Sequence, residues 1–178
     1  MSNHALYRDL MINGVLVSEK IPYPSSEEND KGSIITILAT DAPLNERQLK
    51  RICRRAAVGL SRTGSYMANG SGEIVLAFTT ANHVPHYPKK DILECRLVRD
   101  DALNLVFRAV AEAVEESVLS SLLHAETVTG KHQVQKKSLA ELLDEAAFIS
   151  HFKCVEHEVG GFKLFSDPCG YFFGTARQ

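Results

Sequence analysis

The sequence has neither a long apolar segment nor a strong excess of charge. Its 178 residues carry a formal net charge of −2, with 24% charged and 44% hydrophobic residues, which is typical of an ordinary globular chain. No stretch reaches the ~18 apolar residues of a membrane span, and no basic start leads into an apolar run as in a secretion signal. We therefore expect a cytoplasmic chain that binds neither membranes nor nucleic acid.

Cysteine is sparse and irregularly placed. The positions Cys53, Cys95, Cys154 and Cys169 lack the spacing of metal ligands, so free thiols are favoured over a zinc site or a disulfide framework. Internal repeats and low-complexity tracts are missing as well. The length predicts one domain that is large enough for a sizeable core.

Local patterns predict strands and helices in alternation, and hence an α/β fold class. Apolar and β-branched runs predict strands over residues 11–18, 33–40 and 73–80, the last two of them buried. Helical spacing predicts helices from Asn45 to Leu60, over residues 101–125 and over residues 138–148. Asn45 and Gln48 are the expected capping box of the first helix, and Gly130 is the expected stop signal of the second.

One face of the helix after Asn45 is strongly basic. Its cations are Arg47, Lys50, Arg51, Arg54 and Arg55. Nucleic acid is one interpretation, but no aromatic or groove-binding motif accompanies these side chains. A solvated face or a subunit contact is the better interpretation.

A junction between Gly32 and Ser33 carries the chemistry that the sequence suggests. Residues 22–32 are rich in Pro, Ser, Glu and Asp and predict an exposed linker, which ends where Ser33 opens an apolar strand. Backbone scission at this junction would leave Ser33 with both a hydroxyl and an α-amine, a nucleophile with its own base. The unperturbed pKa of such an amine is roughly 7.7 to 8.0. Taken alone, however, a Gly-Ser before a strand is more often an ordinary turn.

Four motifs together resemble the DmpA-type aminopeptidase family. They are the Gly32-Ser33 junction, residues 39–44 (ATDAPL), residues 62–64 (RTG) and residues 69–73 (NGSGE). The family consists of self-processing enzymes that include L-aminopeptidase/D-amidase/esterases and β-peptidyl aminopeptidases. The resemblance implies a DmpA/ArgJ-like α-β-β-α sandwich, incomplete because the N-terminal half is absent. It divides the chain into the end of an N-terminal subunit with its linker (1–32), a catalytic subunit (33–146) and an unassigned tail (147–178).

The resemblance also implies roles for single residues. Ser33 would be the nucleophile that cleavage at Gly32-Ser33 exposes, and Ser71 would assist proton movement. Glu73 would anchor the free amine of the substrate by a charge-assisted hydrogen bond, and Asn3 would supply an oxyanion-hole donor. No metal or organic cofactor is required.

The same resemblance implies partners and leaves alternatives open. A peptide or an amino-acid amide is the expected substrate, a homo-oligomer is the expected assembly, and a separate N-terminal half is a further candidate partner. One alternative is a catalytically inactive remnant that acts as an oligomerisation module. Another is an acyltransferase on a related self-cleaving scaffold, because water and an amine compete for the same acyl-enzyme.

Overall fold

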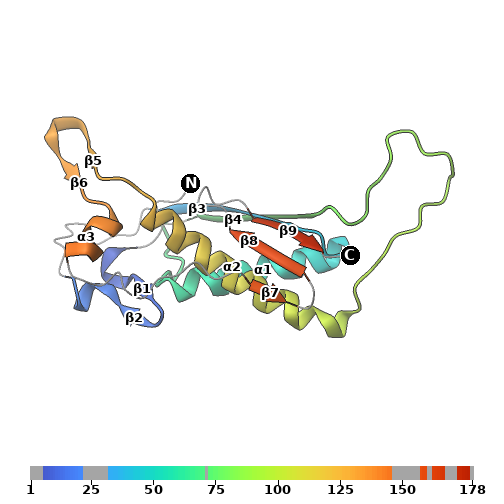
Figure 1. The fold of residues 1–178 in the computed structure, drawn as a ribbon, viewed down its shortest axis with the longest axis horizontal. Coiled ribbons are helices and arrows are strands. Elements are labelled where there is room, and N and C mark those ends of the chain that lie inside the picture. Colours follow the sequence, from blue (N-terminus) through green and yellow to red (C-terminus); the bar gives the residue numbers. More distant parts are fainter. Residues whose placement is uncertain are drawn as a thin grey trace.

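A parallel strand pair with two helices on one face forms the centre of the molecule (Figure 1). Strand β3 (Ser33–Thr40) pairs with β4 (Gly72–Thr79) in parallel, and helix α1 (Glu46–Arg62) connects them. Helix α2 (Leu103–Leu123) packs beside α1. The computed structural model describes residues 6–21, 32–70, 72–145, 157–159, 162–166 and 172–176.

Helix α1 begins at the predicted capping box. The Gln48 backbone N–H donates to Asn45 Oδ1 at 2.9 Å, and the Asn45 backbone N–H donates to Gln48 Oε1 at 3.2 Å. The helix ends at Thr63 and Gly64, where Gly64 has a φ of +96°. A Cβ at Gly64 would lie 1.7 Å from the carbonyl oxygen of Asp9. Only glycine fits here, because both the positive φ and the close approach exclude a side chain.

The main core lies between this strand pair and the two helices. Ile34 and Leu38 of β3 are buried against residues of both helices. The helical members of the cluster are Ile52, Ala56, Leu60, Leu103, Val110, Val114 and Val118. A Cβ at Gly59 would lie 2.5 Å from the Ala111 carbonyl oxygen, so this glycine allows the close contact between α1 and α2.

A second apolar cluster packs the N-terminal segment against the last described helix. The predicted strand over 11–18 is wrong: the segment forms a hairpin of β1 (Met11–Ile12) and β2 (Val15–Leu16). Asn13 and Gly14, with φ of 50° and 76°, make the tight turn that an Asn-Gly pair favours. Residues of the hairpin and of α3 (Leu139–Glu145) share this cluster.

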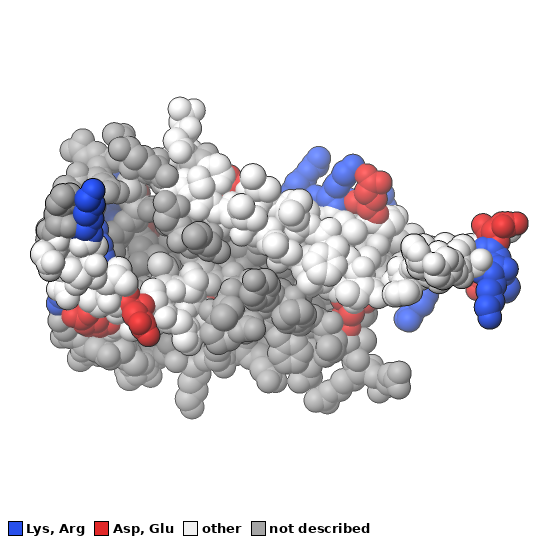
Figure 2. Space-filling view, turned by 90° about the horizontal axis from the view of Figure 1, so that it is seen from above, with Lys and Arg blue, Asp and Glu red and all other residues white. Residues whose placement is uncertain are grey.

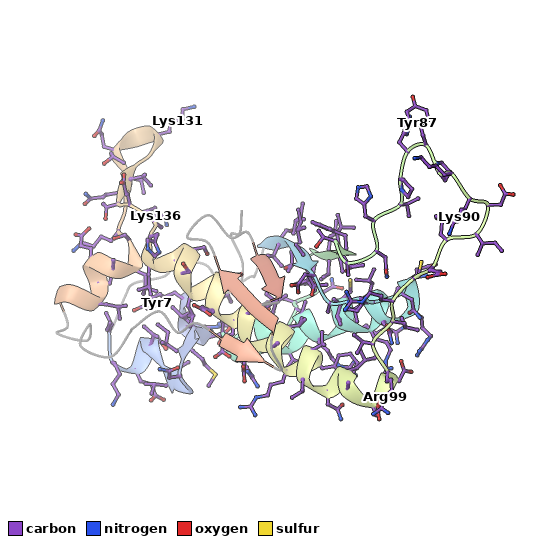
Figure 3. The ribbon with its side chains drawn as sticks, turned by 45° about the vertical axis from the view of Figure 1, so that its right-hand side comes forward. Tyr7, Tyr87, Lys90, Arg99, Lys131 and Lys136 are labelled. Carbon is purple, nitrogen blue, oxygen red and sulfur yellow. The ribbon has the colours of Figure 1, made fainter. Side chains whose placement is uncertain are left out.

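The second long helix is shorter than predicted. A 3-10 turn over Asp100–Ala102 precedes α2, and α2 ends at Leu123 with His124 as its C-cap. Gly130 is therefore not the stop signal. It lies in a hairpin of β5 (Val128–Thr129) and β6 (Gln135–Lys136), where its N–H donates to the Val134 carbonyl at 2.8 Å. Lys131 and Lys136 mark this projecting hairpin in Figure 3.

The expectation that β3 and β4 are buried strands is wrong for one face of the sheet. Strand alternation turns one set of side chains toward the helices and the other set away from them. The outer set is exposed and apolar, and we call it the open sheet face: Ile35, Ile37, Ile74, Leu76 and Phe78. Their exposed fractions run from 43% to 60%. Figure 2, viewed from the sheet side, shows a largely uncharged band here.

A long excursion leaves the sheet after β4. We call residues 83–95 the arm; Figure 1 shows it extending from the body at the end opposite the β5–β6 hairpin. Asn82 closes its base, since Nδ2 donates to the Arg96 carbonyl and Oδ1 accepts from the Arg96 N–H, both at 3.0 Å. Tyr87 is 85% exposed, and Figure 3 shows it at the tip of the arm, pointing away from the body.

The last described strands form a separate antiparallel sheet. Strand β8 (Phe162–Ser166) pairs with both β7 (His157–Val159) and β9 (Phe172–Ala176). Strand β9 contacts β3, while β7 and β8 contact α2. The sequence had left this tail unassigned. Among the residues that the structure describes, no helix has the length and apolar character to cross a membrane.

Candidate active site

Ser33 occupies the first position of β3, and its side chain is exposed. Its partner in the parallel register is Gly72, and a Cβ added at Gly72 would lie 3.8 Å from Ser33 Oγ. A side chain at position 72 would therefore be in van der Waals contact with the hydroxyl. Alternation places Ser33 on the same face as Ile35, so the hydroxyl belongs to the open sheet face.

Gly32 is buried, although the sequence predicted it as the end of an exposed linker. It leads directly into β3, and its burial follows from this position beside the sheet. The remainder of the predicted linker, residues 22–31, lies outside the described residues. The structure thus shows a buried glycine that precedes an exposed serine at the start of a strand.

Glu73 lies at the same end of the sheet as Ser33. It is half-buried and pairs in register with Ile34, one position further along the strands. Alternation turns its side chain toward the helix-covered face, whereas the Ser33 hydroxyl is on the open face. If the Gly32-Ser33 bond were cleaved, the new α-amine of Ser33 would lie at the first position of β3, between these two faces of the sheet.

The other two predicted site residues are not placed by the structure. Ser71 and Asn3 both lie outside the described residues. The chain on either side of Ser71 is described: Asn69 and Gly70 form a turn, and β4 starts at Gly72. Ser33 and Glu73 are therefore the predicted catalytic residues that the structure describes, and they lie at one end of the sheet with their side chains on opposite faces.

Two residues within the quoted motifs have structural roles that the sequence did not reveal. Thr63 is 2% exposed, and its hydroxyl donates to the Leu60 carbonyl at 2.8 Å at the end of α1. Asp41 follows β3, and both of its carboxylate oxygens are buried without a hydrogen-bond partner among the described residues. The Thr63 hydrogen bond is local to the end of α1, whereas the burial of Asp41 depends on what packs around it and has no local sequence signal.

The comparisons with known proteins decide the family. The model of peptidase family S58 matches residues 1–136 of the chain. The chain belongs to peptidase family S58. This is the DmpA family that the four motifs resemble, so the resemblance is confirmed.

Family S58 relatives match in both sequence and structure. The β-peptidyl aminopeptidase BapA of Sphingosinicella microcystinivorans is 41% identical over 113 residues, which cover 62% of this chain and 28% of that protein. The L-aminopeptidase D-Ala-esterase/amidase of Ochrobactrum anthropi, described as a variant of the Ntn-hydrolase fold, matches with a TM-score of 0.68 and 31% identity. The PH0078 protein of Pyrococcus horikoshii matches with a TM-score of 0.69 and 39% identity.

The structural matches confirm a mixed α/β fold of the DmpA type over part of its length. They cover 83% of this chain but only 42% of the Ochrobactrum protein and 40% of the Pyrococcus protein. The chain thus spans less than half of the relatives that it matches. The four motifs all fall inside the region that the family model covers.

Proposed function

We propose that this family S58 chain carries the nucleophile of an aminopeptidase or amidase that removes N-terminal residues from peptides, amides or esters. The observation that carries the proposal is Ser33: an exposed hydroxyl at the first position of a strand, after a buried glycine and beside Gly72. Membership of a family of serine aminopeptidases supports the same chemistry.

Self-cleavage is the first step of the proposed mechanism. Ser33 Oγ attacks the Gly32 carbonyl carbon, the peptide C–N bond breaks, and Gly32 becomes esterified to Oγ while the α-amine of Ser33 is released. Water then hydrolyses the ester to a Gly32 carboxylate and a free hydroxyl. The chain would thereby divide into residues 1–32 and a catalytic part that begins at Ser33.

Substrate hydrolysis repeats this chemistry with an external acyl group. The Ser33 amine takes the hydroxyl proton as Oγ attacks the substrate carbonyl, and this proton goes to the leaving amine. Water hydrolyses the resulting acyl-enzyme. We assign the substrate amine to Glu73, proton movement to Ser71 and the oxyanion to Asn3, with no metal or cofactor.

The chain covers only part of the length of its relatives, and this bears on which partners it needs. Because the chain spans 28% of BapA and 42% of the Ochrobactrum enzyme, we propose that activity requires a polypeptide equivalent to the remaining part of those relatives. A homo-oligomer of the completed unit belongs to the same proposal.

The test asks whether the Gly32-Ser33 bond is cleaved and whether amide hydrolysis depends on this cleavage. The chain is incubated with and without the complementary part of a family S58 relative, and intact mass, N-terminal sequence and hydrolysis of amino-acid amides are measured. We expect a fragment that begins at Ser33 and amide hydrolysis that depends on it. Ser33→Ala should abolish both, whereas Ser61→Ala, a control serine exposed on α1, should abolish neither.

Two outcomes would contradict the proposal. Amide hydrolysis that survives in Ser33→Ala rules out this nucleophile. A complemented chain that stays intact and inactive favours the remnant alternative instead. Product analysis with an added amine acceptor separates hydrolysis from acyl transfer, because a transferase would yield the acylated amine as its main product.

A further inference from the structure

The outer surface of α1 carries a pocket that the proposed peptidase chemistry does not use. Its volume is about 320 Å³, and its lining consists of charged side chains: Glu46, Arg47, Lys50, Arg51 and Arg54. The helix lies against the opposite face of the sheet from Ser33 Oγ. The pocket is therefore separate from the candidate active site.

Two of the cations that line this pocket, Arg47 and Arg51, are held by other side chains, and Arg55 lies next to them on α1. Arg47 Nη2 lies 2.7 Å from both carboxylate oxygens of Asp100, and Arg51 Nη1 lies 3.4 Å from Asp100 Oδ2. The guanidinium of Arg51 stands 5.0 Å and that of Arg55 stands 4.3 Å from the centre of the Phe107 ring. Fixed side chains lose little freedom when a ligand binds, which favours affinity.

Positive charge at the pocket exceeds negative charge. Its four cations face one lining carboxylate, Glu46, and the carboxylate of Asp100. Glu46 accepts from Lys50 at 2.6 Å, but both side chains are more than 70% exposed, so this pair is weak and exchangeable. Within the described residues, Arg54 has no hydrogen-bond or ion-pair partner. Lys50 and Arg54 therefore remain available to an anion.

We propose that this pocket binds a small polyanion of the oligophosphate type. From Arg47 to Arg54 the cations follow one side of α1 for about 10 Å, enough for a linear chain of two or three phosphate groups. Guanidinium and ammonium groups match phosphate oxygens in charge and in hydrogen bonding. All five lining residues are charged and none is aromatic, so the lining offers no ring on which a base could stack. The volume lies at the lower end for small-molecule sites, too small for a folded partner.

The test is calorimetric titration of the chain with sodium tripolyphosphate at low and at physiological ionic strength. We expect binding that weakens with salt and an affinity at least tenfold lower in Arg54→Ala. Glu46→Gln should bind more tightly, because it removes the opposing charge and releases Lys50. This gain cannot result from misfolding. The matched control is Arg108→Ala, which breaks an i,i+4 pair with Glu112 on α2 and should not change the affinity.

Three results of the tripolyphosphate titration would overturn the proposal. These are the absence of binding by the wild-type chain, equal losses in Arg54→Ala and Arg108→Ala, and no gain in Glu46→Gln. Tighter binding of hexaglutamate than of tripolyphosphate would also overturn it, because it would assign the pocket to an acidic peptide. The titration does not depend on Ser33, so failure of the proposed peptidase function leaves its outcome unchanged.

Discussion

At the scale of single residues, Asp41 is in an unfavourable environment within this chain. Both oxygens of its carboxylate are buried, and the described residues provide no donor for either of them. A buried charge without a partner is destabilising. The residue belongs to the ATDAPL motif, which the sequence analysis used for the resemblance without assigning it a role.

We predict that Asp41→Asn stabilises the isolated chain. The amide has nearly the same shape and no charge to desolvate, so the free energy of unfolding should rise by about 1 to 3 kcal/mol at pH 7. Urea unfolding midpoints measure the difference. Asp91→Asn, an exposed control on the arm, should change the midpoint little. A lower midpoint for Asp41→Asn would mean that the carboxylate has a donor in solution.

At the scale of elements, Asp100 joins the start of α2 to the start of α1. Its carboxylate accepts from Arg47 at 2.7 Å and from Gln48 Nε2 at 2.8 Å. The same Gln48 amide donates to the Val98 carbonyl at 2.8 Å, besides its part in the capping box. The hydrogen bond from Gln48 first, and then Arg47, lowers the pKa of Asp100 below its ordinary value of 3.8.

We predict that this contact stabilises the folded chain at neutral pH and that the stabilisation is lost in acid, when the Asp100 carboxylate is protonated. A lowered folded-state pKa means that the stabilisation is complete above pH 3.8 and disappears as the pH falls through the lowered value. Asp100→Asn should therefore lower the urea midpoint at pH 7, and this deficit should shrink below pH 3.8.

The neighbouring Asp101→Asn is the matched control for this pH series. Asp101 pairs with Arg99 at 2.7 Å, and both side chains are largely exposed. Such pairs contribute about 0 to 1 kcal/mol, so we expect a small deficit at pH 7. A deficit for Asp100→Asn that stays constant down to acid pH would contradict the electrostatic explanation.

At the scale of the whole molecule, the open sheet face is an apolar surface that stays exposed in the single chain. Its five apolar residues line one surface of β3 and β4, and the described strands β7–β9 do not cover them. Large contiguous apolar surfaces are uncommon on soluble monomers and mark contact sites. The sandwich that the resemblance implies would bury this face beneath a second sheet.

We predict that the isolated chain self-associates through this face. Ile37 and Leu76 are cross-strand partners there, so the double variant Ile37→Lys/Leu76→Glu should stay monomeric while placing opposite charges side by side. Sedimentation velocity over a range of concentrations measures the association. Val84→Lys, an apolar residue exposed on the arm, should associate like the wild-type chain. A monomeric wild-type chain would contradict this prediction.

The sequence by itself determined the local elements of this protein and its family. Asn45 and Gln48 predicted the start of α1 because a capping box is a local signal, and the four motifs predicted the DmpA relationship because they are contiguous strings. The apolar runs predicted β3 and β4, and the resemblance to the family selected Ser33 and Glu73 as candidates.

Only the tertiary structure decided which surfaces are covered. The apolar runs predicted β3 and β4 as buried strands, but burial depends on what packs against each face of the sheet, and the helices cover one face. The Asn13-Gly14 turn has a local signal, the Asn-Gly pair, which the prediction of one continuous strand overlooked. The burial of Asp41 without a partner among the described residues and the glycine contacts of α1 with Asp9 and Ala111 depend on how the chain packs, which no local pattern encodes.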